Sequence, residues 1–207
     1  MKKVYVILSR TGTGPSHLIG AVTHAEFTHS SLALLPSKHK LYSFARRRMH
    51  NFFVAGFIHE DTETFVFAKY SDAPCAVYAL DVSDAGYCHM CETVARFDAQ
   101  YKRFKYNFIG AATSQLGVRL RLKYRYTCAQ FVATVLQSSG DVVLPKDASL
   151  MKPMDLIDIP GMRQIYRGPL KDISFEEPDE QADTPSGASG DQVPAHGGIV
   201  SHPLKRI

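Results

Sequence analysis

The order of strand-like and helical patterns along this chain constrains its fold more than any other feature of the sequence. Runs rich in β-branched and aromatic residues fill much of the first 82 residues, and amphipathic helical spacing follows. We expect strands at 4–8, 27–35, 40–47, 64–70, 75–82, 118–126 and 163–168, and helices at 15–24, 83–106, 107–117 and 128–139. This order predicts an α+β fold in which an antiparallel sheet packs against helices.

Length and composition fit one globular domain followed by a tail. The chain has 207 residues, 45% of them hydrophobic, and a chain of this size buries roughly 70% of its unfolded surface. From about Glu176 onward the sequence is rich in Pro, Gly, Ser, Asp and Glu and has almost no large apolar residue. Such a segment cannot offset its ordering entropy. We therefore expect a folded domain over 1–175 and a disordered tail over 176–207.

The N-terminal apolar run is too short for a secretory signal. The apolar run from Val4 to Leu8 is too short for the hydrophobic region of a signal peptide, and its composition predicts a buried strand instead. No window approaches the roughly 18 apolar residues of a membrane span. We expect a cytoplasmic protein without stable membrane insertion, whose four cysteines are reduced. A net charge of +4 suits an acidic substrate or lipid headgroups but is low for a dedicated nucleic-acid binder.

Cys128 lies where a helix is predicted to begin. Its apolar neighbours at i+3, i+4, i+7 and i+8 place it on the packed face, which is typical of a core cysteine. However, Thr127 and Gln130 have the spacing of a capping box, which makes Cys128 the first helical residue. The helix dipole and free N–H groups would favour a thiolate there. The residues alone leave a core thiol and a nucleophile about equally supported.

A cysteine nucleophile needs a base, and His29 is the strongest candidate. It opens a predicted strand and shares a face with the small residues Ser31 and Ala33. The alternative is a solvated histidine at a strand end. His17, His24, His39 and His50 occupy helix, loop or turn positions and are weaker candidates.

Together, "THSSLAL", "LYSFARR" and "YTCAQFVATVL" resemble the circularly permuted papain-like branch of the NlpC/P60 superfamily. The closest likeness is to the bacterial YiiX/YebB-like cysteine hydrolases, with lecithin:retinol acyltransferases more distant. As in that branch, the histidine precedes the cysteine. The resemblance covers roughly residues 1 to 170 and implies a permuted papain-like (NlpC/P60) fold.

The resemblance implies a thiol-dependent hydrolase or acyltransferase that acts on an amide, ester or thioester bond without a cofactor or metal. Cys128 would be the nucleophile and His29 the base. The resemblance leaves two candidates for the third catalytic residue, which orients the imidazole. Ser43 stands where the family often has a glutamate. Glu60 could orient the imidazole from a neighbouring element, although it could equally be a solvated loop acid. The implied substrate is a peptide, a muropeptide or a lipid-like acyl compound, including anionic ones.

Two other features permit different functions. Cys88 and Cys91 form a C-x-x-C pair that could be a redox or zinc site, although a helix would simply turn both toward the core. Alternating basic residues at 119–125, with Arg46 to Arg48, could form a basic cleft wall or protect a strand edge. The main alternative function is a non-catalytic module that binds an anionic ligand. Strand alternation would separate the arginines from the tyrosines, which disfavours nucleic-acid binding.

Overall fold

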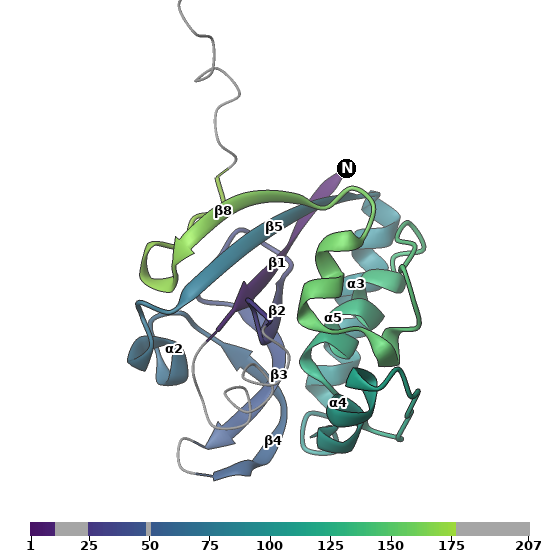
Figure 1. Ribbon diagram of the computed structural model, residues 1–207. Helices are drawn as coiled ribbons and strands as arrows, with labels where there is room; N and C mark the ends of the chain where they lie inside the picture. The colour runs from purple at the N-terminus through teal and green to yellow at the C-terminus, as the bar shows by residue number, and fades with distance from the viewer. Residues whose placement is uncertain (11–24, 49–50, 177–207) are drawn as a thin grey trace, which may run out of the picture. The chain divides into compact units, whose positions relative to one another are not determined.

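The computed structural model describes residues 1–10, 25–48 and 51–176 (Figure 1). The predicted helix at 15–24, with His17 and His24, lies outside the described residues, and so do His50 and the tail from residue 177. Residues Met1–Glu177 form one compact unit. Among the described helices, none is both long and apolar enough to cross a membrane.

Eight strands form a single mixed sheet. Its order is β7-β6-β4-β3-β2-β1-β5-β8, and every pairing is antiparallel except that of β6 with β7. The strands are β1 (Lys2–Ser9), β2 (His29–Ala33), β3 (Leu41–Arg48), β4 (Asn51–Glu60), β5 (Pro74–Val82), β6 (Lys105–Tyr106), β7 (Arg125–Tyr126) and β8 (Arg163–Pro169). The predicted mixture of strands and helices is confirmed.

Helices α3, α4 and α5 lie together on one side of the sheet (Figure 1). The α-helices are α2 (Phe65–Lys69), α3 (Asp84–Ala99), α4 (Phe108–Gln115) and α5 (Cys128–Gln137), and the 3-10 helices are η1 (Ala148–Leu150), η2 (Pro153–Asp158) and η3 (Leu170–Asp172). Ser83 caps α3 by accepting a hydrogen bond from the Gly86 N–H. Of the described α-helices, α5 makes the most extensive contact with β2 and β3.

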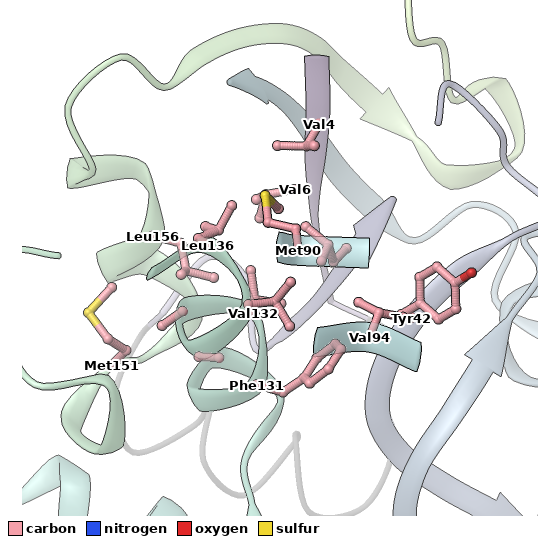
Figure 2. Close-up of a cluster of buried hydrophobic side chains, with 14 of the residues drawn as sticks. Val4, Val6, Tyr42, Met90, Val94, Phe131, Val132, Leu136, Met151 and Leu156 are labelled. Carbon is pink, nitrogen blue, oxygen red and sulfur yellow. The ribbon is translucent and has the colours of Figure 1, made fainter. Parts of the chain in front are cut away.

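The sheet divides the core into two clusters because successive strand residues point to opposite faces. Val4, Val6 and Leu8 of β1 join the cluster under α3 and α5, whereas Tyr5 and Ile7 join the one on the other face. Figure 2 shows Phe131, Val132 and Leu136 of α5 packed with Met90 and Val94 of α3 in the first cluster.

Two predicted strands are wrong. Residues 64–70 contain helix α2, in which the Ala68 N–H donates to the Thr64 carbonyl. Phe67 is buried, whereas Ala68 and Lys69 are both exposed, which departs from the alternation of a half-buried strand. The segment 118–126 contains only β7 and an isolated bridge at Leu122, because Tyr124 has a positive φ of 59° that interrupts an extended run.

Two other boundaries differ from our predictions. The helix predicted to reach residue 106 ends at Ala99, and Lys105–Tyr106 instead form β6. Strand β4 is absent from the sequence predictions because Gly56 lies in its centre and weakens the strand pattern. The structure explains this glycine: a Cβ there would collide with the Phe104 carbonyl and the Arg47 guanidinium.

Candidate active site

Cys128 is the first residue of α5, as predicted. Thr127 is the N-cap, and its hydroxyl accepts a hydrogen bond from the Gln130 N–H at 3.0 Å. The reciprocal half of the predicted capping box does not form, since Gln130 Oε1 has no hydrogen-bond partner within the described part of the chain. The cap therefore comes from Thr127 alone, and it holds the thiol at the positive end of the helix.

The Cys128 thiol is enclosed by β2 and α5. Its residue is only 4% exposed. Burial by itself raises the pKa of Cys128, but a hydrogen bond and a charge interaction with His29, together with contacts from Ser30, lower it below the ordinary thiol value. The sulfur is therefore set up to carry a negative charge next to an imidazolium.

His29 forms an ion pair with Glu60 on its other side. The Nε2 atom lies 3.0 Å from Oε1 and 3.2 Å from Oε2 of Glu60, and the two side chains are 14% and 10% exposed. Burial lowers the pKa of His29, but Glu60 and the Cys128 contact outweigh it and raise that pKa to about 10. Because Nε2 faces Glu60, Nδ1 is the ring nitrogen left for the thiol.

The structure thus brings Cys128, His29 and Glu60 into one connected series. Glu60 ends β4, two strands away from His29 in the sheet, with β3 between them. The alternative that Glu60 is a solvated loop acid is wrong, since its side chain is mostly buried against His29.

Two serines complete the surroundings of the His29 ring. Ser31 Oγ lies 3.3 Å from Nε2 and donates to Glu60. Ser43 Oγ lies 3.4 Å from Nε2 but donates to the Ser30 carbonyl at 2.7 Å. Of the two orienting candidates, only Glu60 supplies a charge to the imidazole, and Ser43 supports the backbone of the same strand.

Tyr106 is a site residue that our sequence analysis missed. Its hydroxyl lies 3.9 Å from the Cys128 Sγ. Burial and the neighbouring Cys128 raise the pKa of Tyr106 well above its ordinary value, so the hydroxyl stays protonated at neutral pH. No local pattern marks this tyrosine, because the contact depends on β6 pairing with β4 and β7.

The remaining cysteines lie apart from this cluster. Cys75 is fully buried, and burial raises its pKa to about 12. Cys88 is exposed and Cys91 is partly buried on α3, so the expectation that both turn toward the core is wrong for Cys88. Residues three positions apart lie only about 60° from each other around a helix, so Cys88 and Cys91 share one side of α3, and Cys88 lies at its exposed edge. No group of three possible metal ligands occurs in the residues that the structure describes.

Several of the basic residues have local partners. Arg119 and Arg121 pair with Asp147. Arg47 donates to the carbonyls of Phe104 and Phe57, at 2.9 and 3.4 Å, and therefore supports the backbone. Lys123 of the segment 118–126 lies 5.3 Å from the centre of the Tyr124 ring, so the predicted separation of cations from tyrosines by strand alternation is wrong for this pair.

Comparison with known proteins identifies no relative of this chain. No protein-family model, curated protein or solved structure matches this chain.

Proposed function

We propose that this protein is a thiol-dependent hydrolase or acyltransferase with a permuted papain-like fold. Its substrate would be an amide, ester or thioester. The observation that carries the proposal is the series Cys128, His29 and Glu60, in which a buried thiol of lowered pKa adjoins an imidazole of raised pKa that is paired with a carboxylate.

In the acylation step, the Cys128 thiolate attacks the substrate carbonyl carbon. A carbon–sulfur bond forms, and the carbonyl π electrons move onto oxygen. When the tetrahedral intermediate collapses, the bond to the leaving group breaks and the His29 imidazolium gives that group its proton. The product is a thioester on Cys128, and His29 is left neutral.

In the second step, His29 takes a proton from water or from an acceptor alcohol or amine. The resulting nucleophile attacks the thioester carbonyl, the carbon–sulfur bond breaks, and the Cys128 thiolate returns. Water gives hydrolysis, and an alcohol or amine gives acyl transfer. Throughout the cycle Glu60 keeps the imidazole oriented and favours its protonated form.

Two groups can donate to the developing oxyanion. The first is the N-terminus of α5, where free N–H groups follow the Thr127 cap. The second is Tyr106, whose neutral hydroxyl lies beside the sulfur that carries the intermediate.

Acyl transfer to Cys128 can be tested with p-nitrophenyl acetate. We expect release of p-nitrophenol and an acetyl adduct on the Cys128 peptide by mass spectrometry. Cys128→Ala should abolish both signals, and Cys88→Ala, which removes an exposed thiol, should leave them unchanged. Equal p-nitrophenol release by the Cys128→Ala protein would contradict the proposal.

Tyr106→Phe tests the oxyanion role. We expect the acylation rate to fall about 100-fold, whereas alkylation of Cys128 by iodoacetamide should change little because that reaction forms no oxyanion. The comparison separates stabilisation of the intermediate from activation of the thiol. If both rates fall equally, Tyr106 acts on the thiolate and not on the oxyanion.

A further inference from the structure

The segment that precedes Cys128 concentrates positive charge. Residues 99–140 contain seven Lys and Arg residues and no Asp or Glu. Because the whole chain has a net charge of +4, the rest of the sequence carries −3. The positive charge is therefore concentrated in the part of the chain that contains β6, α4, β7 and α5.

The same segment also exposes apolar side chains. Of the eight large hydrophobic side chains that are exposed in the described residues, four are Ile109, Leu116, Val118 and Leu122. Leu116 is 80% exposed and Ile109 is 63% exposed. Apolar side chains gathered in one segment of the surface typically mark a site of interaction with a protein or a membrane.

Local hydrogen bonds bring these side chains into one region. Ile109 and Leu116 are seven residues apart, which places them on the same side of α4. The Val118 N–H donates to the Thr113 carbonyl at 3.0 Å, so the chain folds back on the end of α4. The Asn107 side chain donates to the Leu120 carbonyl at 3.5 Å, which ties the following loop to the start of α4.

Cations without a carboxylate partner among the described residues follow Leu122 along the chain. No described carboxylate lies within ion-pair distance of Lys123 or Arg125, although Arg119 and Arg121 share Asp147. Lys123 lies 5.3 Å from the centre of the Tyr124 ring. Apolar side chains flanked by unpaired cations match the chemistry of an anionic lipid surface, which accepts both at the headgroup boundary.

We propose that Ile109, Leu116, Val118 and Leu122, together with Lys123 and Arg125, form a docking surface for an anionic lipid bilayer, which we call the α4 surface. The apolar side chains insert at the headgroup boundary and the cations contact lipid phosphates. The surface begins beside the candidate active site, since the ring of Phe108 lies 4.8 Å from that of Tyr106. Docking itself does not depend on the proposed catalysis.

Tryptophan fluorescence provides a direct test, because the full chain contains no tryptophan. We expect the emission of Leu116→Trp to shift to shorter wavelength with vesicles of phosphatidylcholine and phosphatidylglycerol, but not with phosphatidylcholine alone. Val143→Trp is the matched control, since Val143 is equally exposed outside the α4 surface. It should not shift with either vesicle.

Sedimentation with the same vesicles separates the apolar and charged contributions. Leu116→Ser should weaken binding about tenfold and Lys123→Gln about fivefold. The remote controls Val143→Ser and Lys2→Gln should bind as the original chain does. Cys128→Ala should also bind normally, so a failure of the proposed catalysis does not affect this result.

Four outcomes would overturn the proposal. The first is that the protein does not bind phosphatidylglycerol vesicles, and the second is that neither Leu116→Ser nor Lys123→Gln weakens the binding. The third is that single-stranded nucleic acid displaces the protein from the vesicles and also protects Lys123 from acetylation. The fourth is carbodiimide crosslinking of Lys123 to the acidic residues after 176, which would show that the chain's own C-terminal segment covers the α4 surface.

Discussion

Replacing His29 with alanine is expected to slow alkylation of Cys128 at pH 6.5 by about 10- to 100-fold. In the intact protein, His29 lowers the pKa of Cys128 against the opposing effect of burial. Without the imidazole, burial is the largest remaining influence, and it raises the thiol pKa. The thiolate fraction near neutral pH then falls sharply, and only the thiolate reacts.

The measurement is the pH dependence of iodoacetamide labelling, followed on the Cys128 peptide by mass spectrometry. Cys88 and Cys91 are replaced by serine because both are at least partly exposed. Cys75 is retained, since it is fully buried and its pKa is raised to about 12. His39→Ala is the matched control, because His39 pairs with Asp61 on an exposed loop, and it should leave the labelling curve unchanged.

A Cys128 thiol that titrates at its ordinary pKa in both the intact and the His29→Ala proteins would contradict the proposed mechanism. A non-catalytic module that binds an anionic ligand would then be the better account. That module has no reason to lower a thiol pKa.

Replacing Glu60 with glutamine is expected to destabilise the protein by about 3 kcal/mol at pH 6. The substitution keeps the shape of the side chain but leaves the buried His29 imidazolium without its carboxylate counterion. The folded-state pKa of His29, about 10, lies above its unfolded value of 6.5. The ion pair's stabilisation is therefore fully present below pH 6.5 and is lost as the pH rises through 10.

The difference in unfolding free energy between the original chain and Glu60→Gln should therefore shrink from pH 6 to pH 10. Guanidinium chloride denaturation at several pH values measures it. Glu63→Gln is the matched control: Glu63 is mostly exposed and pairs with Lys38 at 2.6 Å, so its loss should change the free energy of unfolding little at every pH. A Glu60→Gln deficit that grows with pH would contradict the assigned ion pair.

Elements that depend on local sequence were predicted well. Apolar spacing and the Thr127 cap are set within one helical turn, so α5 begins at Cys128 as expected. The strands β1, β2, β3, β5 and β8 also match predicted segments, although most of their ends differ by one or two residues, because each carries a continuous or alternating apolar pattern.

Predictions failed where packing outweighed composition. The aromatic and β-branched residues of 64–70 suggested a strand, but the segment forms a short helix whose buried Phe67 ring lies 6.2 Å from the His29 ring, measured between ring centres. At 118–126 the alternation of charge and apolar residues has no neighbouring strand over most of its length, and alternation without a partner does not make a sheet.

The sequence by itself determined which residue starts α5 and therefore where the Cys128 thiol meets a helix N-terminus, because capping and helical periodicity act over a few neighbouring residues. Only the tertiary structure decided what surrounds that thiol. Glu60 reaches His29 across β3, and Tyr106 reaches Cys128 through the β6 pairings. These contacts join residues 31 and 22 positions apart through sheet order, and no local pattern encodes sheet order.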